Sequence, residues 1–265
     1  MTERNLAFLE GALAGESAIV TGAGQGLGRD IAIALTQAGA RVAVVDINPD
    51  TAEAVSRELG DYGSPGLPIA CDVSQRDQVD ASVATVVSEF GGIDVLVNNA
   101  QNVRNTQMPF VDTDEEHLMV HLRSGLLGTY YYLQACYPYL EQRSGNVVNI
   151  GSGAGVGGLK DHFSYAATKE AIRATTRVVA REWGPDGIRV NTICPAAYDT
   201  PAMKIYLEKA GEETQAWMRS QIPLGRFGGG DEVASVAVFL ASDAASYMTG
   251  HTLMVDGGSN MDAGR

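Results

Sequence analysis

The sequence has few basic residues and lacks any long apolar run. Lys and Arg number 19 against 32 Asp and Glu, which gives a formal net charge of −13 over 265 residues. A chain this acidic is repelled by phosphate backbones and anionic lipid, so its charge argues against nucleic-acid and membrane partners. No apolar stretch approaches the roughly 18 residues that a membrane-spanning helix requires.

Cysteine is also scarce. The three cysteines, Cys71, Cys136 and Cys194, are too far apart for a C-x-x-C pair or a disulfide framework. We interpret them as small buried hydrophobic residues of a reduced protein, which favours a cytoplasmic location. Because no repeat, low-complexity tract or linker divides the chain, we expect residues 1–265 to form a single domain.

Short β-branched runs alternate with longer segments of helical spacing along the whole chain. The runs are apolar on both sides, which is typical of a parallel sheet covered by helices on both faces. The pattern therefore predicts an α/β, doubly wound fold with a seven-stranded parallel sheet. The expected strands span 18–21, 41–46, 67–71, 93–97, 146–150, 188–194 and 252–255. One helix is expected to end at Gly39, and others to span 50–59, 75–90, 113–140, 163–183, 203–220 and 231–241.

Glycines are concentrated directly after the first strand, in the segment T-G-A-G-Q-G-L-G at residues 21–28. Glycines allow the backbone to approach a pyrophosphate, and the helix that follows offers free N–H groups and the positive end of its dipole. Between a buried strand and a helix, this segment predicts phosphate binding. A glycine-rich turn without a ligand is the alternative.

An acidic residue, Asp46, ends the second strand. A carboxylate there can accept hydrogen bonds from both ribose hydroxyls of an adenosine and would repel a 2′-phosphate. Neither Gln25 in the glycine segment nor Ile47 and Asn48 supply a cation, so the pattern favours NAD over NADP. The alternative is that Asp46 caps the next helix, as Asn48 or Asp50 could.

Short polar side chains follow the third and fourth strands as well. Asp72 comes after the third strand, and Asn98, Asn99 and Ala100 come at the end of the fourth. Such side chains can reach an adenine edge or connect the ends of neighbouring strands. The sequence alone leaves both roles open.

Ser152 follows the fifth strand, and Tyr165 and Lys169 lie further on at helical spacing. Residues i and i+4 share one face of a helix, so the ammonium group is expected to lower the pKa of the phenol from about 10 towards working pH. A tyrosine with such a pKa can exchange a proton with a substrate oxygen. Ser152 does not sit in a G-x-S-x-G turn, which argues against an acyl-enzyme. An exposed Tyr–Lys pair without function is the alternative.

Together these motifs resemble the short-chain dehydrogenase/reductase family, from about Leu13 to Gly258. The segments Pro195-x-x-x-x-Thr200 and 256–258 (D-G-G) match its later motifs. The resemblance implies a single NAD-binding Rossmann domain. It also implies that Tyr165 is the general acid/base, that Lys169 lowers its pKa and holds the nicotinamide ribose, and that Ser152 binds the substrate oxygen. The cofactor-binding residues implied are Gly22, Gln25, Gly26, Leu27, Gly28, Asp46, Ile47, Asp72, Val73, Asn99, Ala100, Tyr165, Lys169, Pro195 and Thr200.

Three positions depart from the family's pattern. Gln101 stands where the family usually has a glycine after Asn-Asn-Ala, and Ala196 stands where it has one after Pro195. Gly125 replaces an asparagine of the long central helix that is thought to shape a bend and to support a water linking the lysine to solvent. We expect activity to survive, because a backbone carbonyl can hold that water and glycine tolerates a bend.

The helix expected at 113–140 contains two histidines and a group of five tyrosines. His117 and His121 do not form an H-E-x-x-H motif, so we expect no metal and place them on an outer helix face. Five tyrosines are expected at a subunit interface, because aromatic residues are enriched there and resembling proteins commonly form tetramers. We therefore expect a homotetramer. For the tyrosines, an aromatic wall of the substrate site is the alternative. The tyrosines are Tyr130, Tyr131, Tyr132, Tyr137 and Tyr139.

The combined prediction is an NAD(H)-dependent oxidoreductase that interconverts a secondary alcohol and a ketone. Its substrate is expected to be fairly apolar and to be covered by a lid over about 196–220, where Trp217 lies. One alternative is an NADH-dependent reductase of a 3-oxoacyl compound or another carbonyl. Another is a catalytically impaired nucleotide-binding regulatory protein.

Overall fold

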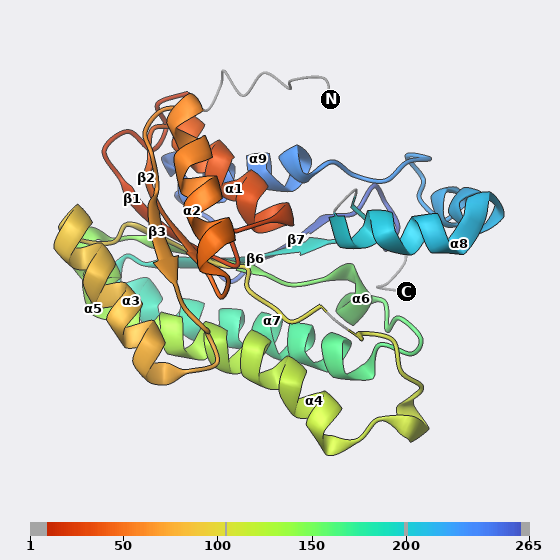
Figure 1. Cartoon of the computed structure of the whole chain (residues 1–265). Helices are drawn as coiled ribbons and strands as arrows, with labels where there is room; N and C mark the ends of the chain where they lie inside the picture. Colours follow the sequence, from red (N-terminus) through yellow and green to blue (C-terminus); the bar gives the residue numbers. More distant parts are fainter. Residues whose placement is uncertain (1–9, 104, 199–200, 261–265) are drawn as a thin grey trace.

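The computed structural model describes residues 10–103, 105–198 and 201–260. Within them, seven strands form one parallel sheet in the order β3-β2-β1-β4-β5-β6-β7 (Figure 1). This confirms the doubly wound α/β fold. The strands are β1 Ser17–Thr21, β2 Arg41–Asp46, β3 Leu67–Ala70, β4 Val95–Asn98, β5 Asn146–Ile150, β6 Arg189–Pro195 and β7 Thr252–Val255.

The direction of strand addition reverses at the centre of the sheet. From β1 the chain adds β2 and β3 on one side, and β4 then pairs with β1 on the other. In open parallel sheets, ligands bind outside the carboxyl ends of the strands at such a reversal. We therefore expect the binding site among the residues that follow β1, β2, β4 and β5.

Helices cover both faces of the sheet (Figure 1). On one face lie α1 Gly26–Gln37, α2 Pro49–Glu58 and α9 Gly230–Ala241; on the other lie α3 Arg76–Phe90, α5 Gly128–Arg143 and α7 Phe163–Trp183. Helix α4 Glu115–Leu122 lies against α7, while α6 Gly153–Val156 and α8 Pro201–Ser220 lie beyond the carboxyl ends of β5 and β6.

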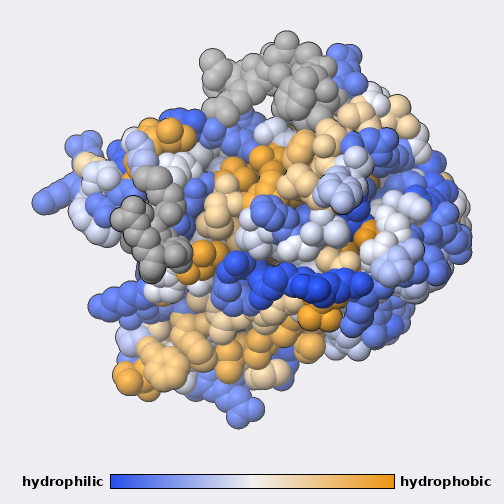
Figure 2. Space-filling view, turned by 180° about the vertical axis from the view of Figure 1, so that it is seen from behind, coloured by the Kyte–Doolittle hydropathy of each residue, from blue (hydrophilic) through white to orange (hydrophobic). Residues whose placement is uncertain are grey.

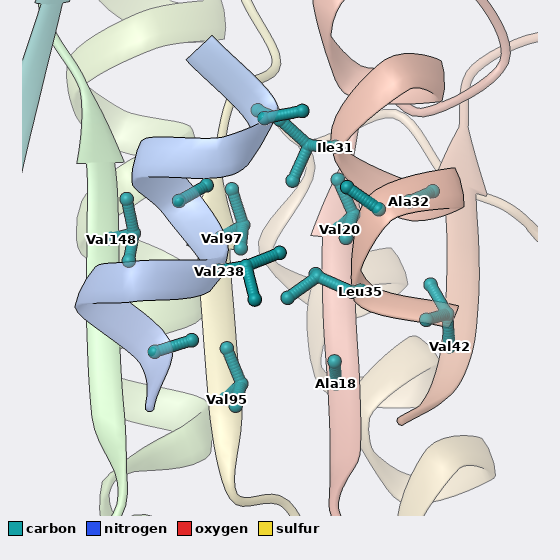
Figure 3. Close-up of a cluster of buried hydrophobic side chains, with 14 of the residues drawn as sticks. Ala18, Val20, Ile31, Ala32, Leu35, Val42, Val95, Val97, Val148 and Val238 are labelled. Carbon is teal, nitrogen blue, oxygen red and sulfur yellow. The ribbon is translucent and has the colours of Figure 1, made fainter. Parts of the chain in front are cut away.

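The central strands are buried on both sides, as their apolar sequences predict. Figure 3 shows one core, in which Val20 of β1 and Val97 of β4 lie under Leu35 of α1 and Val238 of α9. These residues are fully buried. Burial of a side chain of this size stabilises the fold by about 1.5–3 kcal/mol, so this core holds the ends of β1 and β4 in place.

The prediction of one continuous helix over 113–140 is wrong, because the segment is not regular along its whole length. It consists of α4, a π-helical segment at Arg123–Leu127, and α5. Gly125 lies in that segment, and the Ser124 hydroxyl donates to the Val120 carbonyl at 2.9 Å. Side chains that bond into the helical ladder favour such irregular turns, which sequence periodicity does not reveal.

Two other expectations need correction. Tyr132, expected at a subunit interface, is fully buried in the chain's own core, where its hydroxyl lies 2.7 Å from the Ser82 hydroxyl. The helix expected over 203–220 is broken at Gly211, whose φ is 75°. A positive φ favours glycine and ends regular helix, so α8 is two helical segments that meet at this residue.

The surface carries a group of exposed apolar side chains beside α4 and α7. Phe110, Val111, Leu159 and Phe163 are all exposed, and Figure 2 shows apolar residues along the lower part of the face it presents. Among the described residues, no helix is both long and apolar enough to cross a membrane. Nor do the described residues contain a cluster of side chains suited to binding a metal.

Candidate active site

The glycine turn after β1 is shaped by contacts that exclude larger side chains. Gly22 and Gly26 have φ of 63° and 56°, a conformation that glycine adopts without strain. A Cβ atom on Gly28 would collide with the Gly22 carbonyl oxygen and lie 2.5 Å from the Asn99 Nδ2 atom. Position 28 is thus packed against the turn and β4, whereas a Cβ atom on Gly26 would meet nothing within 4 Å, so the backbone is open there.

Asn99 connects the ends of β4 and β1. Its Nδ2 donates to the Thr21 carbonyl at 2.9 Å and to the Gly22 carbonyl at 3.1 Å. The Thr21 hydroxyl accepts from the backbone N–H groups of Asn99 and Ala100, each at 3.0 Å. The sequence left open whether Asn99 reaches an adenine edge or connects the ends of neighbouring strands. These contacts show that it connects β4 to β1.

Asp46 faces the glycine turn from the end of β2. Its Oδ2 accepts from the Gly24 N–H at 2.9 Å, and its Oδ1 accepts from the Asn48 N–H at 3.0 Å. Asn48, rather than Asp46, caps α2 by accepting from the Asp50 N–H. The Asp46 carboxylate is therefore fixed beside the turn, with lone pairs left for further donors. Ile47, the next residue, is exposed.

The other residues implied for cofactor binding have varied surroundings. The Asp72 Oδ1 accepts from the Ser74 N–H and hydroxyl at 2.9 and 2.7 Å, so this carboxylate shapes the turn after β3. Val73 is buried against Gly128. Gln25 precedes α1, Leu27 packs on the core and Pro195 ends β6. Thr200 lies outside the described residues.

The structure brings Ser152, Tyr165 and Lys169 together at the carboxyl end of β5. Ser152 caps α6 by accepting from the Ala154 N–H at 3.1 Å, and its hydroxyl is near enough to the Tyr165 phenol to act on the pKa of that group. The Lys169 Nζ lies 5.7 Å from the centre of the Tyr165 ring and donates to the Ile150 carbonyl at 2.7 Å. Because Lys169 is buried, its ammonium acts in a site of low dielectric constant.

The expected lowering of the tyrosine pKa is wrong. Burial raises the pKa of Tyr165, which outweighs the lowering by the hydrogen bond to Ser152; Cys194 raises it further. The Lys169 ammonium is turned to the Ile150 carbonyl, and burial lowers its own pKa to about 8. The phenol therefore keeps its proton at neutral pH.

Buried Lys169 has a consequence for stability that can be measured. An unfolded chain holds the lysine proton up to about pH 10.5, whereas the folded chain releases it near pH 8. Folding stability therefore rises with pH through this window, and below it the buried charge lowers stability. We expect Lys169→Met to raise the melting temperature at pH 7 by about 2–4 °C, and by less at pH 10.

Thermal denaturation of the cofactor-free protein at both pH values measures this effect. Lys160→Met is a suitable control, because Lys160 is exposed and its replacement removes the same charge. A Lys169→Met protein that melts below the wild type at pH 7 would show that the bond to Ile150 outweighs the cost of burial.

Of the two histidines of α4, His121 is buried, contrary to the outer position expected, while His117 is partly exposed. His121 is only 1% exposed, and its ring meets the Tyr165 ring edge-on with centroids 6.3 Å apart. The His117 Nδ1 lies 2.8 Å from the Ser164 hydroxyl, and its Nε2 lies 2.6 Å from the Asn105 carbonyl oxygen. Burial lowers the pKa of His121, with a smaller contribution from His117. The i, i+4 spacing placed both on one face, but not which face.

Several known proteins are similar to this chain over most of its length. A family model described as Enoyl-(Acyl carrier protein) reductase matches residues 22–260. The chain is 39% identical over 252 residues to a 12alpha-hydroxysteroid dehydrogenase of a Clostridium species, covering 92% of this chain and 96% of that protein. It is 37% identical over 249 residues to a 3-oxoacyl-[acyl-carrier-protein] reductase of Thermotoga maritima, covering 93% and 98%.

The chain is also similar to a dehydrogenase of known structure. A 7alpha-hydroxysteroid dehydrogenase complexed with NADH and 7-oxo glycochenodeoxycholic acid matches with a TM-score of 0.88 at 33% identity, covering 96% of this chain and 97% of that one. The chain belongs to the short-chain dehydrogenase/reductase family, whose members are oxidoreductases that bind a nicotinamide cofactor. The residues present fit such a cofactor, because the space beside Gly26 at the start of α1 is open and the Asp46 carboxylate faces the same turn.

Proposed function

We propose that this protein is an NAD(H)-dependent oxidoreductase that interconverts a secondary alcohol and a ketone. The observation that carries the proposal is that Ser152, Tyr165 and the buried Lys169 meet at the carboxyl end of β5, with the Lys169 Nζ 5.7 Å from the centre of the Tyr165 ring. These groups lie at the same edge of the sheet as the glycine turn and Asp46, because every strand is parallel. A proton-transfer group and a cofactor site therefore share one edge.

The roles of the side chains follow from their chemistry. A bound nicotinamide would supply or accept the hydride. During reduction Tyr165 donates its proton to the substrate oxygen, and during oxidation it takes that proton back. Ser152 donates a hydrogen bond to the same oxygen, which holds it in place. When the phenol loses its proton, the Lys169 ammonium stabilises the phenolate.

We further propose that Asp46 selects NAD over NADP. Its carboxylate is held against the glycine turn by two backbone N–H groups, and it would repel a 2′-phosphate. A lost hydrogen bond to a charged group costs about 1.5–3 kcal/mol, so we expect Asp46→Ala to weaken NADH binding by about 10- to 100-fold. NADPH binding should improve, because the repulsion is removed.

Fluorescence titration with each reduced cofactor measures this preference without a substrate. Asp50→Ala serves as the control, because Asp50 is an exposed acid near Asp46 at the start of α2. Tighter binding of NADPH than of NADH by the unaltered protein would contradict the proposal.

The substrate that we propose is a fairly apolar secondary alcohol. Two of the similar proteins are named as dehydrogenases of hydroxysteroids, which are alicyclic secondary alcohols. The similar 3-oxoacyl reductase represents the alternative, in which the same groups reduce a carbonyl with NADH. We propose that Tyr165 and Ser152 act in the same way in either case, so the substrate panel must include both classes.

The test is a panel of aliphatic, alicyclic, terpenoid, steroid and sugar alcohols with NAD, followed by NADH absorbance. A 3-oxoacyl thioester with NADH is the reverse arm, and each assay is repeated with Tyr165→Phe. Turnover that the variant lacks supports the proposed chemistry. Tight NADH binding without turnover of any compound would instead favour a catalytically impaired nucleotide-binding regulatory protein.

We also propose that the chain forms a homotetramer and acts in the cytoplasm. The exposed apolar side chains beside α4 and α7 (Figure 2) are suited to burial between copies of the chain. Its three cysteines are all free and buried, which agrees with a reduced setting.

A further inference from the structure

The side chain of Gln101 occupies the space above Gly125. Gln101 lies in the loop after β4, and Gly125 lies in the π-helical segment between α4 and α5. A Cβ atom on Gly125 would collide with the Gln101 Oε1 atom and lie 2.5 Å from the Thr168 Cγ2 atom. The Gln101 carboxamide thus fills the space that a side chain at position 125 would need.

Gln101 also bonds to the last turn of α4. Its Nε2 donates to the His121 carbonyl at 3.2 Å and lies 3.4 Å from the His121 Nδ1 atom. A carbonyl oxygen can only accept, so the amide nitrogen must be the atom that faces it. This carbonyl lies directly before the π-helical segment, where the regular ladder of helical hydrogen bonds is interrupted. Gln101 therefore connects the loop after β4 to the end of α4.

The end of α4 in turn contacts the reacting tyrosine. The buried His121 ring lies edge-on against the Tyr165 ring, and the His117 ring contacts Ser164, the residue before Tyr165. Thr168, which lies against Gly125, is fully buried on the same helix as Tyr165. A shift of the His117–His121 part of α4 would therefore move the Tyr165 side chain.

The Gln101 Oε1 atom is buried and has no hydrogen-bond partner in the structure. A buried carboxamide oxygen left without a donor lowers stability, so an apolar side chain of this size would suit the site better if it served packing alone. The polar side chain is explained by the bond that its nitrogen makes to α4.

We propose that Gln101 is a positioning residue for Tyr165, which it holds through His121 and the π-helical segment. Its meaning for catalysis rests on the function proposed above, but the contacts themselves do not. If Gln101 is lost, the His121 ring moves relative to Tyr165, and the phenol is displaced from the Ser152 hydroxyl. Displacements of about 1 Å can lower turnover by as much as 100-fold.

The first experiment needs neither substrate nor cofactor. The chain has four histidines, so the ring signals of His121 in a proton–carbon NMR spectrum can be assigned from a His121→Gln variant. We expect Gln101→Ala and Gly125→Ala each to move these signals, because each displaces the carboxamide. Gln134→Ala is the matched control, since Gln134 is exposed and bonds only to Arg76 at 2.8 Å among the contacts observed.

The second experiment measures turnover of the best alcohol of the panel. We expect Gln101→Ala and Gly125→Ala each to lower kcat by about 10-fold with the KM for NAD unchanged, and the double variant to lose no more than either single one. Gln101→Met, which fills the same volume without the bond, should be as slow as Gln101→Ala.

The two experiments distinguish the positioning role of Gln101 from the proposed oxidoreductase function. Unchanged His121 signals in Gln101→Ala, full activity of Gln101→Met, or additive losses in the double variant would each overturn the positioning role. Shifted His121 signals in a protein that turns over no alcohol would leave the positional inference supported and count against the proposed function.

Discussion

Replacement of Tyr165 by phenylalanine is expected to lower kcat by about 10²- to 10⁴-fold, the usual contribution of a general acid or base. The substitution removes one oxygen atom from a ring that stays packed against His121. The Ser152 hydroxyl and the Lys169 ammonium remain in place, but the phenol that we propose exchanges a proton with the substrate oxygen is gone.

Initial rates of NADH formation measure this loss, and NADH fluorescence titration serves as the accompanying control. Affinity for NADH should be unchanged, because the phenol oxygen is a small part of the cofactor site. Tyr247→Phe provides the matched variant, since Tyr247 is fully exposed. A Tyr165→Phe protein with wild-type turnover would exclude the proposed acid–base role and require another proton donor.

Replacement of Gly28 by alanine is expected to weaken cofactor binding on the order of 10- to 100-fold, because overpacking costs about 1–3 kcal/mol. The added methyl group would collide with the Gly22 carbonyl oxygen and press on the Asn99 amide. Both neighbours are fixed, one as backbone and the other by its bonds to Thr21 and Gly22. The glycine turn must therefore move, and its N–H groups move with it.

Titration with NADH and thermal denaturation together distinguish loss of the site from loss of the fold. Gly184→Ala is the matched control, because a Cβ there meets nothing within 4 Å. A Gly28→Ala protein with unchanged NADH affinity would show that the turn does not form the cofactor cradle.

The sequence predicts which residues of the candidate site lie at one edge of the sheet, because these residues directly follow the strands. Each strand is apolar on both sides, so a parallel sheet covered by helices could be expected, and parallel strands place their following residues at one edge. The residues after β1, β2 and β5 therefore share an edge without any knowledge of side-chain contacts. Ser152 and Tyr165 meet for this reason.

Contacts between loops and helices were not predictable in the same way. The spacing of His117 and His121 shows that they share a helix face, yet the choice between solvent and Tyr165 depends on how α4 packs against α7. The same holds for Asp46 and Asn48, either of which can cap α2. Only the geometry shows that Asn48 does so and that Asp46 faces the glycine turn.

By itself, the sequence determined the fold class, the family and the order of the motifs along one edge of the sheet. These depend on patterns within short segments, because strand burial, helix spacing and glycine turns are local properties. The tertiary structure alone decided the charge environment and the packing of the site. It turned Lys169 to the Ile150 carbonyl, raised the pKa of Tyr165 by burial and placed Gln101 over Gly125. Burial and contact distance depend on residues far apart in the chain, so no local pattern records them.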